Sequence, residues 1–250
     1  MIIRFHYTYI ILAISFIIIG YFSNILVFTS IIIIHELGHY LIAKIVKLNP
    51  QEITIYPFGG ITKMVHPINS PIIKELIVSI SGIIFQLLYF LITYIFYNKG
   101  IIREYIFNEF ITYNKSILLF NILPIHPLDG SVFLCLLLQK IFPYKTTLKL
   151  NIILSILTSI YLLMINYYKF NYTTILIISV IMTNIVKYYK SINYNFNKFL
   201  LERYLYKLHF KKTKNISKIT KMYKEKYHII KEKNNYLTEK QLLNRRFKEK

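Results

Sequence analysis

Cysteine and acidic residues are scarce in this 250-residue sequence. The single cysteine, Cys135, excludes a disulfide within the chain. Only 11 residues are acidic against 31 lysines and arginines, so the formal net charge is +20, and Asp129 is the only aspartate. The sequence also lacks an aromatic stacking module and any known nucleic-acid motif, so we expect no nucleic-acid partner despite the basic charge.

Apolar residues, in contrast, make up 55% of the chain. Apolar runs of about 17 to 25 residues match the thickness of a bilayer. A signal peptide is the alternative for the first run because Arg4 precedes it, but no small-x-small cleavage site follows. The sequence therefore predicts an all-α polytopic membrane protein with about six transmembrane helices, at residues 7–22, 25–46, 76–97, 116–140, 149–168 and 172–189.

The basic residues are concentrated at the C-terminus, where 19 Lys or Arg and five Glu follow from Lys187 onward. Cytoplasmic N- and C-termini place most of the positive charge inside the cell, as the positive-inside rule requires. We expect a transmembrane domain at residues 1–195 and a small basic cytoplasmic tail at residues 196–250, which would lie on an anionic lipid surface. Weak amphipathic patterns at residues 200–210 and 238–247 predict short helices in this tail.

Two segments interrupt the apolar helical pattern. Residues 47–71 contain four prolines and the pair Gly59–Gly60, which predicts two short β-prone runs around a turn. This hairpin is either membrane-associated and buried in protein or a plain cytoplasmic hairpin. In the second segment, Pro124 and Pro127 cannot continue a regular helix, so we expect the fourth span to be broken around Asp129.

The motif HELGH, residues 35–39, lies inside an apolar run, where an ionisable side chain costs about 2.5–3.5 kcal/mol on insertion scales. On a helix, the i, i+4 spacing places His35 and His39 on one face, with Glu36 about 100° around the axis. Zinc hydrolases use this arrangement: the histidines bind zinc, and the glutamate takes a proton from the water on the metal. The alternative is a pair of buried histidines satisfied by hydrogen bonds.

A catalytic zinc ion normally has three protein ligands and one open position. Asp129 is our candidate for the third ligand because it lies within a predicted span. At a rise of 1.5 Å per residue, its expected depth in the bilayer is similar to that of His35. His126 is an alternative ligand, and Asp129 could instead cap a helix beside Gly130. We expect one Zn2+ per chain.

These motifs, with YPFGG, ISGIIFQ and LPIHPLDG, resemble the site-2 protease (M50) family of intramembrane zinc metallopeptidases. The layout over about residues 1–200 is similar to the stage IV sporulation protein FB subgroup. The resemblance implies that His35, His39 and Asp129 bind zinc and that Glu36 is catalytic. It also implies cleavage of a membrane-tethered precursor, a pro-sigma factor in sporulation, with membrane regulatory proteins as further partners.

The sequence departs from the family pattern in the third span, where members usually read Gly-Pro and carry an asparagine one turn on. Here Ile83 follows Gly82, and Gln86 stands near the asparagine position. By resemblance, Asn121 has a substrate-binding role. The tail resembles only one half of a CBS domain, so ATP, the substrate and the membrane surface are alternative ligands for it.

Peptide hydrolysis requires an extended substrate, which could add as a strand to an exposed hairpin edge. We expect Phe58, Gly59 and Gly60 to admit or align the substrate there. Two other functions fit intramembrane histidines and a carboxylate: a metal-ion transporter, in which Glu36 has no required role as a base, and a catalytically inactive membrane scaffold.

Overall fold

The computed structural model describes residues 2–57, 59–165, 172–206, 208–210, 212–232 and 235–248. These residues form two compact units. The first unit contains residues 1–66 and 74–122, and the second contains residues 67–73 and 123–250. The sequence predicts that a transmembrane domain ends at residue 195 and that a cytoplasmic tail follows. This boundary stays a prediction.

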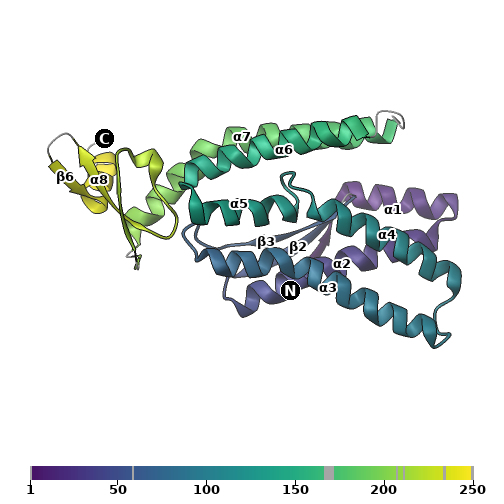
Figure 1. The fold of residues 1–250 in the computed structure, drawn as a ribbon. Helices are drawn as coiled ribbons and strands as arrows, with labels where there is room; N and C mark the ends of the chain where they lie inside the picture. The colour runs from purple at the N-terminus through teal and green to yellow at the C-terminus, as the bar shows by residue number, and fades with distance from the viewer. Residues whose placement is uncertain are drawn as a thin grey trace. The chain divides into compact units, whose positions relative to one another are not determined.

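The first unit contains a small sheet and four helices (Figure 1). In order along the chain, its elements are β1 (Ile2–Phe5), α1 (Tyr7–Ile19), α2 (Phe22–Ile45), β2 (Pro50–Tyr56), β3 (Gly59–Met64), most of α3 (Ile72–Asn98) and α4 (Glu104–Ile122). Helix α2 contacts both β2 and β3 as well as α1 and α4. It is therefore the central helix of this unit.

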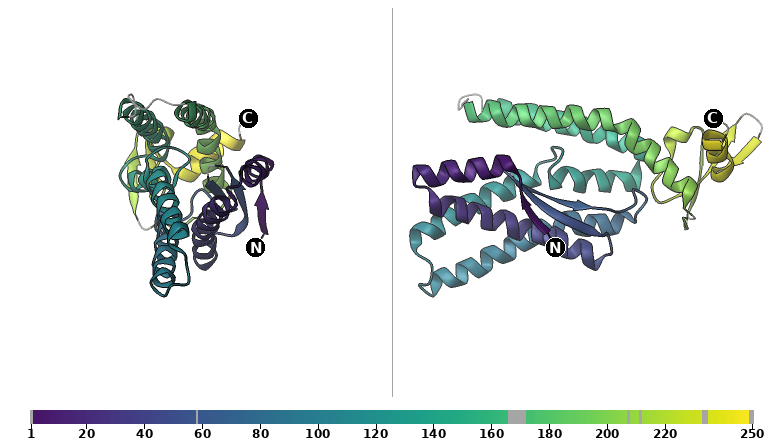
Figure 2. Two further views of the ribbon diagram at one scale, coloured as in Figure 1. Left: turned by 90° about the vertical axis from the view of Figure 1, so that its right-hand side faces the viewer. Right: turned by 180° about the vertical axis from the view of Figure 1, so that it is seen from behind.

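The predicted hairpin is confirmed, because β2 and β3 pair in antiparallel register. Strand β1 adds to β2 in parallel, so the strand order is β1-β2-β3 and β3 is an edge strand (Figure 2). Ile53 and Ile55 are fully buried and pack with residues of α1 and α2. They lie opposite Thr62 and Gly60, and directly opposed residues share one face of a sheet. This face therefore turns Gly60 and Thr62 of β3 toward α2.

Helices α2 and α3 approach each other closely at Gly38. A Cβ atom there would lie 2.7 Å from the Ser81 carbonyl oxygen and 2.9 Å from Phe85 Cβ. Small residues allow such close approach between membrane helices, where packing rather than the hydrophobic effect holds helices together. The contact brings α3 against the HELGH turn of α2.

The second unit contains a helical part and a C-terminal module of strands and one helix. Its elements are α5 (Asp129–Ile141), α6 (Tyr144–Ile165), α7 (Tyr172–Leu205), β4 (Thr213–Ile216), the short 3-10 helix η2 (Ile219–Lys221), β5 (Tyr227–Glu232), β6 (Asn235–Thr238) and α8 (Glu239–Lys248). Helices α6 and α7 lie side by side (Figures 1 and 2). Strand β5 pairs in parallel with β4 and in antiparallel with β6.

The two helices predicted in the tail have different outcomes. The pattern at residues 238–247 corresponds to α8, which confirms that prediction. The pattern at residues 200–210 is instead the end of α7, which continues to Leu205. Phe199 and Leu200 of α7 are fully buried and pack with Met222, Ile230 and Leu243 of the module, so α7 extends into the module core.

Three helices in the described part of the chain, α2, α3 and α6, are long and apolar enough to cross a membrane. The first predicted span forms α1, whose 13 residues fall short of the roughly 20 that a crossing needs. The fourth is broken as expected, since α4 ends at Ile122 and α5 begins at Asp129. The six-span count stays a prediction.

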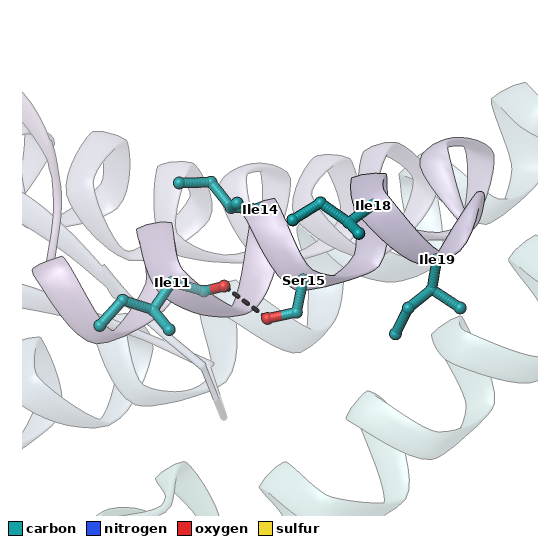
Figure 3. A pocket seen from close by; sticks show the side chains of 5 residues that line it. All are labelled: Ile11, Ile14, Ser15, Ile18 and Ile19. Carbon is teal, nitrogen blue, oxygen red and sulfur yellow. Dashed lines mark hydrogen bonds between the residues drawn. The ribbon is translucent and has the colours of Figure 1, made fainter.

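Helix α1 presents an apolar surface. Ile11, Ile14, Ile18 and Ile19 line a pocket with Ser15 (Figure 3). The Ser15 hydroxyl donates to the Ile11 carbonyl oxygen at 2.7 Å, one turn earlier in the same helix. The one hydroxyl in this surface is thus satisfied within the helix, which suits contact with lipid.

Candidate metal and catalytic site

The HELGH motif lies in α2 of the first unit. His35, Glu36 and His39 have exposed fractions of only 3%, 5% and 5%. Helix α3 contacts the two histidines, and strand β3 contacts the glutamate. The prediction that the histidines share one helix face is confirmed, because their rings lie 4.9 Å apart between centroids.

The histidine protons can be assigned from their partners. His39 Nδ1 lies 2.8 Å from the backbone carbonyl oxygen of Val78. A carbonyl oxygen only accepts hydrogen bonds, so Nδ1 of His39 carries the proton and Nε2 of the neutral ring is unprotonated. His35 Nδ1 lies 3.0 Å from the amide oxygen Oε1 of Gln86, which likewise only accepts. His35 therefore has the same tautomer.

The two unprotonated Nε2 atoms lie 3.2 Å apart. Two nitrogens bound to one tetrahedral zinc ion, each about 2.0–2.1 Å from it, lie roughly 3.3 Å apart. The separation and the donor atoms of His35 and His39 thus fit two ligands of one zinc ion.

Gly82 of α3 lies against both imidazole rings. A Cβ atom at this position would lie 2.4 Å from His39 Nε2 and 2.6 Å from His35 Nε2. Any larger residue would displace the rings. The close packing explains why glycine stands in the third-span motif, whereas the residue after it, Ile83, is not needed for this contact.

Glu36 lies against strand β3. The Thr62 hydroxyl is 2.7 Å from Glu36 Oε2 and 3.3 Å from the Glu36 carbonyl oxygen. A Cβ atom on Gly60 would lie 2.3 Å from Glu36 Cγ. The inner face of the hairpin therefore packs directly on the glutamate side chain.

Residues 23–107, which include α2, the hairpin and α3, match the sequence model of Peptidase family M50. This part of the chain is therefore similar to peptidase family M50. Over 133 residues the chain is 32% identical to Stage IV sporulation protein FB of Bacillus subtilis (strain 168). That alignment covers 53% of the chain and 46% of the relative, so the chain spans about half the length of this relative.

The fold of the chain is similar to that of a solved structure, the Site-2 Protease from Methanocaldococcus jannaschii. The TM-score is 0.59 at 21% identity, with 74% of this chain and 89% of the other chain covered. The predicted resemblance to the site-2 protease family is therefore confirmed. Together with the three apolar helices in the described part of the chain, the similarity to family M50 supports a membrane protein.

The proposed third ligand and its alternative belong to the second unit. Asp129 is the first residue of α5 and is half-buried. The His126 ring stacks on Tyr188 with 3.9 Å between centroids, and its backbone N–H donates to Ser155. Packing against Tyr188 accounts for the partial burial of His126.

The predicted substrate-binding residues are only partly placed. Gly60 contacts Glu36, and Gly59 begins β3 with a φ of 144°, which favours glycine. Asn121 lies in the last turn of α4 and is half-buried. Phe58 lies outside the described residues.

The sequence alone did not reveal two residues of the candidate site, Gln86 as the partner of His35 and Thr62 as the partner of Glu36. Gln86 had a detectable signal, because it is a polar residue within the long apolar run of α3, as the histidines are in α2. Thr62 had none, since threonine is common in strands.

Proposed function

We propose that this protein is an intramembrane zinc metalloendopeptidase of peptidase family M50 that cleaves a membrane-tethered protein. The observation that carries the proposal is the pair of unprotonated His35 and His39 Nε2 atoms 3.2 Å apart, beside the buried carboxylate of Glu36. The similarity to family M50 supports a metalloprotease independently of this geometry.

One zinc ion would be held by His35, His39 and Asp129, each of which offers one ligand atom, an imidazole nitrogen or a carboxylate oxygen. When bound, it would supply a Lewis acid that polarises the scissile carbonyl and makes a water molecule more acidic. The three protein ligands leave the open position that a catalytic site needs.

Glu36 is the general base in this proposal. It takes a proton from the attacking water and later passes it to the leaving amine. Thr62 donates to Glu36 Oε2 and so fixes the orientation of the carboxylate relative to the histidines. The chemistry of a metallopeptidase therefore falls to residues of α2, with β3 holding the base in place.

Strand β3 is suited to present the substrate, because it is the edge of the sheet and its inner face contacts Glu36. An unwound substrate segment would add to this edge through backbone hydrogen bonds. Phe58, Gly59 and Gly60 would align it at the turn of the hairpin, and Asn121 would contact it from α4. The membrane-associated form of the hairpin is the one that this role requires.

The wider biological role follows from the named relative. By similarity to Stage IV sporulation protein FB, the substrate would be a pro-sigma factor in sporulation, and membrane regulatory proteins would control its cleavage. The N- and C-termini would be cytoplasmic, with the basic residues from Lys187 onward on the anionic lipid surface.

The test is co-expression of the full chain with a membrane-tethered precursor, comparing wild type with Glu36→Gln. Loss of the base should lower cleavage by about 100- to 10,000-fold and leave zinc content unchanged. Glu104→Gln, at the exposed start of α4, is the matched control and should cleave normally. Undiminished cleavage by Glu36→Gln would exclude the protease mechanism.

The same strains test the two alternatives. A metal-ion transporter would carry zinc across vesicle membranes with no precursor cleavage, and Glu36→Gln would leave this flux intact. A catalytically inactive scaffold would show neither cleavage nor flux in the wild type. Removal of zinc by a chelator should stop cleavage, and its return should restore it.

A further inference from the structure

Gln86 is a fully buried amide in the apolar helix α3, with an exposed fraction of 0%. Burying an amide costs roughly 1–3 kcal/mol, judged from mutations in proteins, unless it forms hydrogen bonds. Both ends of this amide form them: Oε1 lies 3.0 Å from His35 Nδ1, and Nε2 donates to the Asn114 carbonyl oxygen at 2.8 Å. Gln86 therefore connects α3 with α2 and α4.

The direction of each bond is fixed by chemistry. The Asn114 carbonyl oxygen only accepts, so the NH2 group of Gln86 must face it and the amide oxygen must face His35. Since an amide oxygen also only accepts, the proton on His35 must be on Nδ1. The backbone of α4 thus determines, through one side chain, which nitrogen of His35 is unprotonated.

We propose that Gln86 is a positioning residue for His35, which it holds as the Nδ1–H tautomer with Nε2 presented to zinc. This inference rests on the proposed function, because it concerns the same metal. His39 is held by the Val78 carbonyl oxygen, a backbone atom that substitution does not remove. The Ser81 hydroxyl also lies 3.4 Å from His39 Nδ1, but the closer partner of this nitrogen is the backbone carbonyl at 2.8 Å. At His35, in contrast, the partner at 3.0 Å is a side chain, and a single substitution can delete it.

The test is the zinc affinity of the purified full chain in detergent, measured by competition with a chelator. Gln86→Leu keeps the volume but removes the acceptor, and should weaken zinc binding by about 10- to 100-fold, as loss of such outer partners typically does. Gln139→Leu is the matched control, because Gln139 is also a buried glutamine in a helix, with Cys135 as its partner in the second unit. It should bind zinc as the wild type does.

Gln86→Glu separates positioning from packing. It keeps an acceptor oxygen for His35, so we expect the zinc affinity to lie within about fivefold of the wild type. Loss of an outer partner, by comparison, can weaken metal binding by up to about 100-fold. Equal losses in Gln86→Leu and Gln86→Glu would mean that Gln86 only packs the helices, which overturns the proposal. Wild-type affinity in Gln86→Leu would overturn it too.

A second measurement needs no variant of Gln86. Nitrogen-15 NMR of histidine-labelled wild-type chain should show the Nδ1–H tautomer for the signal that disappears in His35→Asn. An Nε2–H tautomer would overturn the inference. Failure of the proposed function looks different: the wild type would bind no zinc, or Glu36→Gln would still cleave.

Discussion

Within the described residues, histidine and glutamate are buried together in α2 and in the C-terminal module, and the two clusters differ in the partners of their polar atoms. In the C-terminal module, Glu239 Oε2 accepts from both the backbone N–H and Nδ1 of His228, and Oε1 accepts from Arg203. His228 Nε2 accepts from the Tyr223 N–H. Each of these acceptors thus meets a protein donor.

In α2, by contrast, two histidine nitrogens without protons lie 3.2 Å apart beside a carboxylate. Two such ring nitrogens are placed to bind one cation, whereas His228 Nε2 and the Glu239 oxygens accept from hydrogen-bond donors of the protein. Burial and residue type thus do not distinguish a metal-binding cluster from a structural one. The direction of the hydrogen bonds distinguishes them.

Arg203 gives the first and largest test of this contrast. It donates to Glu239, to the side chain of Asn69 and to the carbonyl oxygens of Tyr223, Lys224 and Lys226. Arg203→Leu would leave the Glu239 carboxylate buried without its charge partner, which should destabilise the module by about 3–5 kcal/mol. Amide hydrogen exchange in β5 would report the loss.

Arg246→Leu is the control for this change. Arg246 lies in α8 and makes an exposed hydrogen bond to Asn197, so its loss should alter stability by no more than about 0.5 kcal/mol. Zinc content should stay unchanged in both variants, because none of the proposed ligands His35, His39 and Asp129 belongs to this cluster. A stable module in Arg203→Leu would contradict the structural reading of the cluster.

Acid sharpens the contrast with a smaller effect. Burial lowers the pKa of His228 below its ordinary value of 6.5, and protonation at Nε2 would oppose the Tyr223 N–H. The unfolded chain therefore binds more protons than the folded one below pH 6.5, and stability is lost as the pH falls toward the folded pKa. Between pH 7.5 and 5.5 the loss should be at most about 1.4 kcal/mol.

Glu239 contributes only in stronger acid. Burial alone would raise its pKa, but the hydrogen bond from His228 and the charge of Arg203 outweigh burial and hold the pKa below 4.5. Its stabilising effect is thus lost as the pH falls below 4.5. Hydrogen exchange in β5, corrected for intrinsic rates, should show the loss of stability between pH 7.5 and 5.5 in the wild type and not in His228→Asn. An identical loss in both would assign the acid sensitivity to other groups.

The sequence was informative where local periodicity or backbone chemistry decides the structure. The i, i+4 spacing placed His35 and His39 together, and Pro124 and Pro127 predicted the break between α4 and α5. Strand β1 was missed because Ile2–Phe5 is only four residues long, with Arg4 among three apolar residues, and so short a run carries no clear strand pattern. The start of α4 was missed as well, because its first turns are too polar for a hydropathy search to detect.

Contacts between distant residues could not be predicted in the same way. The bond between His35 and Gln86 joins residues 51 apart and depends on how α2 packs on α3 at Gly38. The bond between Thr62 and Glu36 depends on the register of the hairpin, which turns Thr62 rather than Ile61 toward α2. A shift of one residue would reverse these faces.

That register gives the last and smallest test, since Thr62 contacts Glu36, the proposed base, and is not one of the proposed metal ligands. Thr62→Val keeps the shape of the side chain but removes the donor to Glu36 Oε2. A hydrogen bond to a charged group contributes about 1.5–3 kcal/mol, and if about half of it acts on the transition state, cleavage should slow roughly 3- to 10-fold. Thr54→Val, on the opposite face of the sheet, should cleave at the wild-type rate. Zinc content should be normal in both variants, because His35 and His39 are untouched. Equal rates for the two variants would mean that β3 packs on Glu36 without orienting it. A neighbouring hydrogen-bond donor would then be important for Glu239 in the module but not for Glu36.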